Sequence, residues 1–269
     1  FQLDTEGQPT KIPYDNAGYM DIAPEDKCEN VRREICLLLE QMGIYPESSH
    51  HEEGPGQNEI DFRYSDPLTA ADNTLTFQAV VKTVAQRNGL YADFSPKPLR
   101  HQPGNGFHIN ISVKGGNCED PLSHMIAGIL EHIPELTVFM NPTVASYERF
   151  GGPKAPEYIS WSNQNRSQLI RVPAAVDEYR RAELRSPDPT TNPYLAFALL
   201  IYAGLDGIQQ KLPLPAPTDL NLFTASADIL AHLQRLPLTL REAATLAANS
   251  SFVSKYLPKT IVQTYYDQR

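Results

Sequence analysis

The sequence is poor in cysteine, has no long apolar run and carries no excess of basic residues, and each shortage narrows what the protein can be. It has 3 cysteines in 269 residues. Because Cys28, Cys36 and Cys118 lack the spacing of metal ligands, we expect reduced, ordinary thiols. No apolar run reaches the roughly 18 residues of a membrane helix, and no basic-then-apolar signal segment opens the sequence. These features predict a cytoplasmic protein with no membrane partner.

The charge balance is acidic, with a formal net charge of −9. Because binding to a nucleic-acid backbone requires a basic surface, nucleic acid is not expected as a partner. An acidic protein can still bind a phosphate-bearing ligand when divalent cations supply the positive charge. The charge therefore argues against nucleic acid as a ligand but is compatible with a small phosphate-bearing ligand.

Helical and strand patterns alternate along the chain and predict an α+β fold. Apolar spacing predicts helices at residues 24–43, 70–87, 121–139 and 193–210, with two further helical stretches at 225–236 and 239–248. Two-residue alternation predicts strands within residues 44–66, 106–113 and 181–185. We expect helices packed on a mainly antiparallel sheet. We expect residues 1–212 to form the core, and residues 213–269 to form a Pro-rich linker and C-terminal helices of the same domain.

The polar faces of these strands carry residues suited to a divalent cation. Glu52 and Glu59 flank a Gly-Pro-Gly turn, and two close carboxylates repel each other unless a cation neutralises them. His108 and Glu183 take the polar faces of two other strands. Each strand alone is also consistent with a solvated polar face, but together they provide the oxygen ligands that Mg²⁺ or Mn²⁺ prefers. A zinc protease is not indicated, because the helical His-Glu-x-x-His spacing is absent.

Arginines accompany these groups and suit an anionic substrate. Arg181 and Arg185 share a strand face with the glutamate between them, and Arg149, Arg166 and Arg171 form a second basic group. A guanidinium binds phosphate or carboxylate with two parallel hydrogen bonds. Surface ion pairs with the abundant acids are the alternative interpretation of the second group.

Taken in order, the motifs resemble those of the glutamine synthetase family. The resemblance extends over about residues 1–210, and its strength comes from five collinear motifs rather than from any one of them. These motifs are His50-His51-Glu52 with Gly56-Gln57-Asn58-Glu59, Ser95-Pro96-Lys97-Pro98 with Gly106-Phe107-His108, Asn165-Arg166-Ser167 with Ile170-Arg171-Val172-Pro173, Arg181 to Arg185 with Pro187-Asp188-Pro189 and Asn192-Pro193-Tyr194-Leu195, and Ala203-Gly204-Leu205-Asp206-Gly207.

The resemblance implies a curved, mainly antiparallel sheet and a role for each matched residue. It implies binding of glutamate, ATP and Mg²⁺ or Mn²⁺, with ammonium or an amine as the nucleophile, in a homo-oligomer of stacked rings. The implied metal ligands are Glu52, Glu59, His108 and Glu183. The implied catalytic residues are Arg166 and Arg171, which also bind ATP together with Glu47 and Ser112. The implied glutamate-binding residues are Gly104, Arg149 and Arg185.

The sequence departs from the family pattern at several positions. Residues 1–4 are typical of the end of a strand, so we expect a piece of a longer protein that lacks a Glu-x-Glu strand and an N-terminal domain, and a poor catalyst by itself. Lys154 stands where the family flap has a glutamate that handles ammonium. Glu178 replaces an ATP-contacting lysine, and Asn110 replaces a common histidine.

The resemblance thus predicts an ATP-dependent ligase that forms glutamine from glutamate and ammonia through γ-glutamyl phosphate. Because a protonated lysine at position 154 repels ammonium, a γ-glutamyl-amine ligase that uses a larger amine is the first alternative. A non-catalytic, synthetase-like ligand-binding protein is the second. A guanidino-kinase-like phosphotransferase would share the arginine-rich chemistry but does not account for the collinear motifs.

Overall fold

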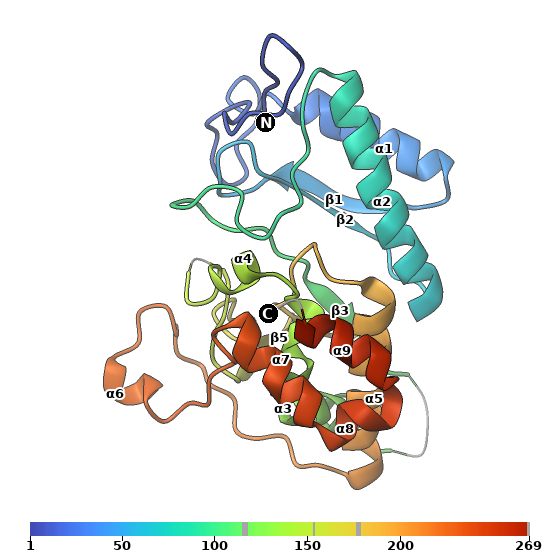
Figure 1. The fold of residues 1–269 in the computed structure, drawn as a ribbon, viewed down its shortest axis with the longest axis vertical. Coiled ribbons are helices and arrows are strands. Elements are labelled where there is room, and N and C mark those ends of the chain that lie inside the picture. Colours follow the sequence, from blue (N-terminus) through green and yellow to red (C-terminus); the bar gives the residue numbers. More distant parts are fainter. Residues whose placement is uncertain (115–117, 153, 176–178, 268–269) are drawn as a thin grey trace. The chain divides into compact units, whose positions relative to one another are not determined.

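The computed structural model describes residues 1–114, 118–152, 154–175 and 179–267. The chain divides into two compact units (Figure 1). The first unit comprises residues 1–94 and 98–104, and the second comprises residues 95–97 and 105–269. The predicted linker and C-terminal helices belong to the second unit, and the division between the units falls within residues 1–212.

The first unit is built from a two-stranded hairpin and two helices. Strands β1 (Pro46–His51) and β2 (Asn58–Phe62) pair antiparallel where the sequence predicts a strand–turn–strand. Helices α1 (Glu29–Gln41) and α2 (Pro67–Arg87) pack against each other. The core between these elements is apolar, and its burial provides the main driving force for folding this unit. Its buried members are Ile35, Leu39, Ile44, Val80 and Val84.

Both helices of this unit begin at residues other than those predicted. Helix α1 begins five residues later than expected, because the Asp26 carboxylate accepts hydrogen bonds from the Cys28 amide at 2.9 Å and from the Arg32 guanidinium at 2.6 and 3.1 Å. Asp26 therefore precedes the helix instead of lying in its first turn. Helix α2 begins three residues earlier, because Asp66 caps it and Pro67 occupies its first position.

The second unit contains a four-stranded sheet of order β3-β6-β5-β4. The β3–β6 and β5–β6 pairs are antiparallel and the β4–β5 pair is parallel, so the sheet is mainly antiparallel, as predicted. The strands are short: β3 (Ile109–Ile111), β4 (Trp161–Asn163), β5 (Ile170–Val172) and β6 (Ala182–Leu184).

The strand predicted at residues 106–113 is shorter in the structure. Only Ile109–Ile111 pairs with β6. Before it, the Phe107 amide donates to the Pro187 carbonyl at 2.8 Å, a contact outside the ladder. Alternation of apolar residues therefore marks the buried face correctly but overestimates the length of the paired segment.

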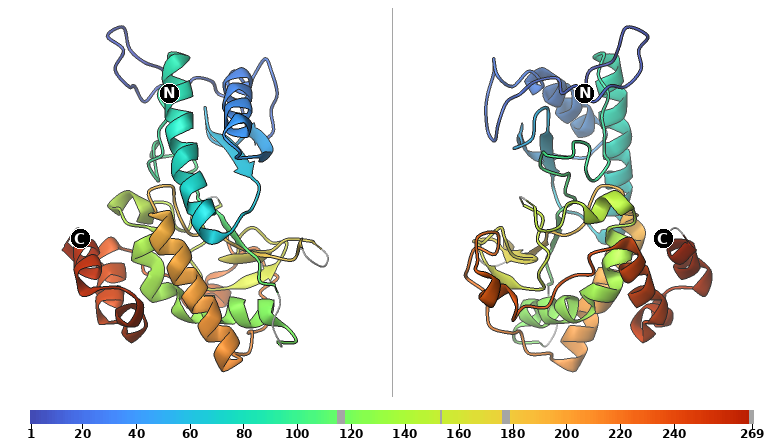
Figure 2. Two further views of the ribbon diagram at one scale, coloured as in Figure 1. Left: turned by 90° about the vertical axis from the view of Figure 1, so that its right-hand side faces the viewer. Right: turned by 60° about the vertical axis from the view of Figure 1, so that its left-hand side comes forward.

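Helices α3 (Pro121–Met140) and α5 (Pro193–Gln210) pack more extensively against each other than any other pair of elements (Figure 2). Glycines allow their close approach: a Cβ added to Gly128 would lie 2.2 Å from the Ala203 carbonyl oxygen, and one on Gly207 would lie 2.1 Å from the His124 carbonyl oxygen. The main core of the unit contains residues of both helices and of the sheet, including Ile126, Phe139, Ile170, Leu184 and Leu199.

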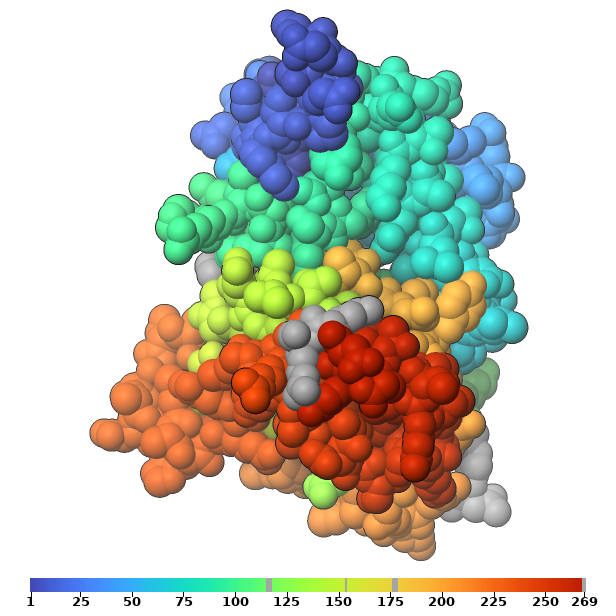
Figure 3. Space-filling model, in the orientation of Figure 1, coloured from blue at the N-terminus to red at the C-terminus, as the bar shows by residue number. Residues whose placement is uncertain are grey.

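The remaining helices lie mostly in the C-terminal part, which gathers on one face of the second unit (Figure 3). They are α4 (Val144–Tyr147), α6 (Ala227–Leu230), α7 (Leu240–Asn249), α8 (Ser251–Tyr256) and α9 (Lys259–Asp267). The helical stretch expected at residues 225–236 is reduced to α6, where no residue is buried to stabilise a longer helix. The one expected at 239–248 is confirmed as α7. Among the described helices, none is both long and apolar enough to cross a membrane.

Candidate active site

The hairpin of the first unit places three ligand-type side chains on one face. His50 and Glu59 are cross-strand partners, and Glu52 follows His50 by two residues, so all three point to the same side. Pairing continues beyond β1, because the Glu52 amide donates to the Gln57 carbonyl at 2.8 Å. Gly56 in the turn has φ +62°, a conformation that glycine adopts at little cost.

These three side chains are arranged as a possible cation site. One ligand atom from each lies within 4.8 Å of the other two. The Nε2 atom of His50 lies 3.9 Å from Glu52 Oε1 and 3.8 Å from Glu59 Oε2. These separations are too long for hydrogen bonds, but they fit donor atoms that share a cation at about 2.1 Å each.

A buried pair anchors this end of the hairpin. His51 is 0% exposed, with Nε2 2.9 Å from Asp15 Oδ1 and Nδ1 2.7 Å from the carbonyl oxygen of Glu52. The same Asp15 oxygen accepts a hydrogen bond from the Gly56 amide at 3.0 Å. Asp15 therefore holds both the last residue of β1 and the turn, and this fixes the backbone on which His50 and Glu52 stand.

Two other predicted residues of this unit lie apart from the three ligands. Glu47 is exposed on β1, at the point where the register of the hairpin shifts. Gly104 accepts a hydrogen bond at its carbonyl oxygen from Gln57 Nε2 at 3.1 Å, which ties its loop to the hairpin turn. The roles of both residues in binding ATP and glutamate stay predictions.

In the second unit, Glu183 is the centre of a cluster of charged groups. Its cross-strand partner on β5 is Arg171, whose Nη1 lies 2.8 Å from Glu183 Oε2. Arg185, the residue just after β6, places Nη1 2.6 Å from Glu183 Oε1. The side chains of Glu183 and Arg185 are only 8% and 3% exposed, so this is a buried carboxylate between two guanidinium groups.

His108 completes this cluster. Its Nδ1 lies 3.3 Å from Glu183 Oε1. Although burial opposes ionisation, the hydrogen bond from His108 and the charges of Arg185 and Arg171 lower the pKa of Glu183 far below its usual range. Desolvation lowers the pKa of His108, against the pull of Glu183, which favours the neutral imidazole that can bind a metal.

Arg149, to which the resemblance gives a role in binding glutamate, is buried, with 2% of its surface exposed. Its Nη1 donates to the Ser186 carbonyl at 3.0 Å and lies 3.9 Å from Asp188 Oδ2. Burial lowers the pKa of Arg149 to about 10, against the opposing charge of Asp188. Within the described residues, its Nε has no hydrogen-bond partner. The guanidinium thus keeps donor capacity in a desolvated position.

The other predicted residues of this unit are more exposed. The Arg166 side chain is exposed, while its carbonyl accepts a hydrogen bond from Arg185 Nε at 3.1 Å. Ser112, just after β3, is exposed. Lys154 is half-buried and has φ +59°, a left-handed conformation. Asn110 accepts a hydrogen bond from Arg181 at 3.2 Å. The remaining departure from the family pattern, Glu178, lies outside the described residues.

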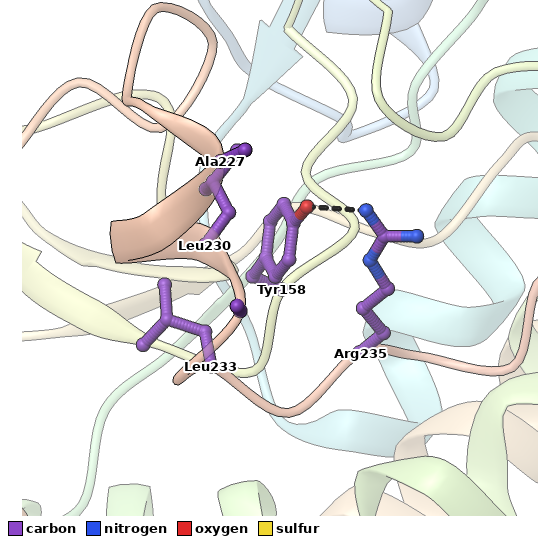
Figure 4. A pocket seen from close by; sticks show the side chains of 6 residues that line it. Tyr158, Ala227, Leu230, Leu233 and Arg235 are labelled. Atoms are coloured by element: carbon purple, nitrogen blue, oxygen red, sulfur yellow. Dashed lines mark hydrogen bonds between the residues drawn. The ribbon is translucent and has the colours of Figure 1, made fainter.

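A hollow of about 370 Å³ lies elsewhere in the second unit (Figure 4). Leu230, Leu233 and Tyr158 give it an apolar wall. Arg235 donates to the Tyr158 hydroxyl at 2.6 Å and covers its ring, with Cζ 5.0 Å from the ring centroid. No residue predicted for the site lines this hollow, and we assign it no role.

The structure therefore brings the predicted residues together in two groups, one in each unit. Glu52 and Glu59 meet in the first unit, and His108 and Glu183 meet in the second with Arg171 and Arg185. Sequence reasoning missed His50 as a member of the first group. The sequence did contain a signal for His50. In a strand, residues two positions apart lie on the same face, so His50 shares the face of Glu52 and His51 does not.

Comparison with known proteins identifies the family. A family model described as "Glutamine synthetase, catalytic domain" matches residues 2–269. Glutamine synthetase from Methanosarcina mazei is 45% identical, with 98% of this chain and 63% of the relative covered. The enzyme from Staphylococcus aureus strain MW2 is 42% identical, with 100% and 64% covered.

Solved structures agree in fold. A structure titled "GmaS/ADP complex-Conformation 1" superposes with a TM-score of 0.84 at 28% identity, covering 98% of this chain and 65% of that one. Plasmodium falciparum glutamine synthetase gives a TM-score of 0.80 at 26% identity, with 94% and 60% covered. The chain spans just under two thirds of the length of these relatives. It carries the catalytic domain of the glutamine synthetase family, to which it belongs.

Proposed function

We propose that the protein carrying this chain is an ATP-dependent ligase that joins glutamate to ammonia. The observation that carries the proposal is the Glu183 cluster, where a buried carboxylate lies between Arg171 and Arg185, within a chain that matches the family's catalytic domain over residues 2–269. In the proposed reaction, a γ-carboxylate oxygen of glutamate attacks the γ-phosphorus of ATP and releases ADP. The nitrogen of ammonia then attacks the acyl carbon, and phosphate leaves.

The arginines supply orientation and charge. We assign Arg171 and Arg166 to the transferred phosphoryl group and to ATP, and Arg185 and Arg149 to the carboxylates of glutamate. A guanidinium holds such anions at two points, and stabilisation of developing charge in a desolvated site is a large part of the catalysis of phosphoryl transfer. Glu183 holds Arg171 and Arg185 in place through contacts of 2.8 and 2.6 Å.

The donor groups fit a divalent cation. Glu52 and Glu59 offer close carboxylates, with the buried Nε2 of His50 facing them. We propose that Glu52 and Glu59 hold Mg²⁺ or Mn²⁺ in the first unit, and that His108 and Glu183 are the cation ligands of the second. When bound, the cation neutralises charge on the phosphoryl group in transfer. Glu47 and Ser112 are assigned to ATP, and Gly104 to glutamate.

A second candidate function is the ligation of glutamate to a larger amine. It is favoured by Lys154, which stands where the resemblance places an ammonium-handling glutamate. A lysine cation disfavours ammonium nearby, whereas an amine with an apolar tail can gain contacts that offset the repulsion. Retention of Glu52, Glu59, His108, Glu183 and the arginines argues against a scaffold that only binds ligands.

The test is ATP turnover by the complete protein with glutamate and either ammonium or a panel of primary amines of increasing size. Turnover with ammonium at a higher kcat/KM than with any amine supports glutamine synthesis. A higher kcat/KM with one amine supports the second candidate. No release of phosphate with any nucleophile, from a protein that binds ATP and Mn²⁺, would leave only the ligand-binding scaffold.

We also propose that the complete protein is a cytoplasmic homo-oligomer.

A further inference from the structure

We propose that His50 is a third ligand of the cation held by Glu52 and Glu59, and that its nitrogen shifts the preference of this position from Mg²⁺ toward Mn²⁺. The inference rests on the proposed function and deepens it, because it names the residue that selects the cation. It concerns only the hairpin of the first unit.

The hairpin geometry makes His50 part of the cluster. Its backbone pairs directly with that of Glu59, and Glu52 lies two residues away on the same face. By contrast, His51 turns to the opposite face and is held by Asp15 at 2.9 Å. The two adjacent histidines therefore have different tasks: His51 anchors the strand, and His50 is left facing the carboxylates.

The Nε2 nitrogen of His50 faces the two carboxylates without a hydrogen bond to either of them. Its Nε2 atom is buried and, among the described residues, has no hydrogen-bond partner. A buried polar atom without a partner costs roughly 1–3 kcal/mol. The two nearest carboxylate oxygens lie 3.8 and 3.9 Å away. That gap is too wide for a hydrogen bond, but a cation bonded to all three atoms at about 2.1 Å fits it and satisfies the nitrogen.

The ring is also held in orientation. Tyr19 and His50 pack edge to face, with centroids 5.6 Å apart and planes at 90°. The side chain of His50 is 16% exposed and that of Glu52 is 14% exposed. A ring fixed between a hairpin and a second aromatic ring needs little reorganisation to bind a metal, and this increases the affinity that a single nitrogen can provide.

The chemistry of the donors then sets the preference. Mg²⁺ favours an octahedron of oxygens and keeps several of its waters. An imidazole nitrogen is a softer donor that suits first-row transition cations better than Mg²⁺. Two glutamates alone would serve either ion, so the nitrogen of His50 is what distinguishes Mn²⁺ from Mg²⁺ here.

Pulsed electron paramagnetic resonance of Mn²⁺ bound to the complete protein tests this, because a directly bound imidazole modulates the echo through its ¹⁴N nucleus. The proposed function makes His108 a second nitrogen ligand, so the measurement is made in a His108→Asn background. We expect ¹⁴N modulation to remain there and to disappear in the His50→Phe, His108→Asn double variant. Modulation that is absent in the His108→Asn protein, or unchanged by His50→Phe, would overturn the proposal.

Cation affinities provide a second measurement that does not depend on the double variant. His50→Gln keeps a polar side chain of similar length and replaces nitrogen by oxygen. We expect it to weaken Mn²⁺ binding by about tenfold or more while changing Mg²⁺ binding by less than about threefold, since loss of one ligating group has effects of this order. Equal changes for both cations would overturn the proposal. The exposed His101, replaced by Gln, is the matched control.

Turnover measured in parallel separates this inference from the proposed function. Nitrogen modulation from His50 in a protein without ligase activity would keep the cation site and reject the ligase. Ligase activity in a protein that lacks this modulation would keep the ligase and reject the role of His50.

Discussion

Arg171 and Glu183 face each other across the β5–β6 ladder as direct cross-strand partners, and their side chains meet at 2.8 Å. Arg185 closes on the other oxygen of the same carboxylate at 2.6 Å. A single glutamate thus balances two guanidinium groups in a nearly buried position. An anionic substrate that draws one arginine away would free a carboxylate oxygen for a cation, so binding of the two is expected to be mutually favourable.

The first prediction concerns this carboxylate. Glu183→Gln keeps the shape of the side chain but leaves Arg185, which is 3% exposed, without its counter-ion. Breaking a buried pair from one side costs roughly 3–5 kcal/mol, and loss of an aligned charged group lowers kcat by about 100-fold or more. Urea unfolding and ATP turnover measure the two effects.

The control for Glu183→Gln is Glu131→Gln, an exposed position on α3. It should change neither the unfolding free energy nor kcat appreciably. Equal behaviour of the two variants would mean that the cluster contributes nothing to stability or catalysis. The low pKa of Glu183 adds a pH signature: its stabilisation is present above the ordinary glutamate pKa and is lost as the pH falls below it.

The second prediction is a loss of stability at alkaline pH that depends on His132. Its ring nitrogens lie 2.7 Å from Glu135 Oε1 and 2.9 Å from Asp206 Oδ2, and the ring stacks on Phe252 with centroids 3.7 Å apart. Although burial opposes the charged ring, the hydrogen bonds to Glu135 and Asp206 raise its pKa. The stabilisation is therefore complete below the ordinary histidine pKa and is lost as the pH rises through the raised one.

The measurement is the urea-unfolding midpoint at a series of pH values from 5.5 to 8.5 in roughly half-unit steps, chosen to span the ordinary histidine pKa. His132→Gln should flatten the descent that the unaltered protein shows over this range. His232→Gln, at an exposed position, should leave the descent unchanged. A descent that survives His132→Gln would assign the pH dependence to other groups.

The third prediction concerns the contact between α3 and α5. In Gly128→Ala the new Cβ would lie 2.2 Å from the Ala203 carbonyl oxygen and 2.7 Å from the Gly207 amide nitrogen, so the two backbones must separate. Overpacking costs about 1–3 kcal/mol or more, which exceeds the gain of about 1 kcal/mol from replacing a helical glycine. Calorimetric melting should show a lower Tm. Gly18→Ala, with ordinary contact at 3.6 Å, should not, and a Tm for Gly128→Ala at or above the original would show that the helices separate freely.

The fourth prediction tests the flap. Lys154→Glu replaces a positive charge that repels ammonium by a negative charge that attracts it. We expect the ratio of kcat/KM for ammonium to kcat/KM for a primary amine to rise by about tenfold, which corresponds to about 1.4 kcal/mol. Lys211→Glu is the matched control, since Lys211 also has a left-handed conformation, at φ +52°. An unchanged ratio for Lys154→Glu would separate the flap from the choice of nucleophile.

Local signals predicted the long helices of the second unit well. Helices α3 and α5 both carry proline at the first position, after Asp120 and Asn192, whose side chains accept hydrogen bonds from first-turn amides. The start of α1 was wrong, because it depends on the bond between Asp26 and Arg32. Contacts of that kind are set by tertiary packing and leave no periodic pattern in the sequence.

The candidate site was predicted only in part, because some of its contacts also depend on tertiary packing. Strand alternation placed Glu183 and Arg185 on one face, and the structure confirms their contact. It did not lead us to His50, because attention to the turn selected only the two flanking glutamates. The burial of Arg149 could not be predicted either, since, among the described residues, two of the three hydrogen-bond partners of its guanidinium lie 37 and 38 positions away in the sequence.

Asp15 has a consequence for the order in which the protein forms. It accepts hydrogen bonds from the Lys27 and Gly56 amides and lies 2.9 Å from His51, so three separate stretches of chain converge on one carboxylate. During synthesis Asp15 leaves the ribosome before the hairpin does. The acceptor is therefore made before its partners, and we expect the end of the hairpin that carries His50 and Glu52 to become fixed once His51 and Gly56 have emerged. We therefore expect this end of the hairpin to become ordered in the direction of translation.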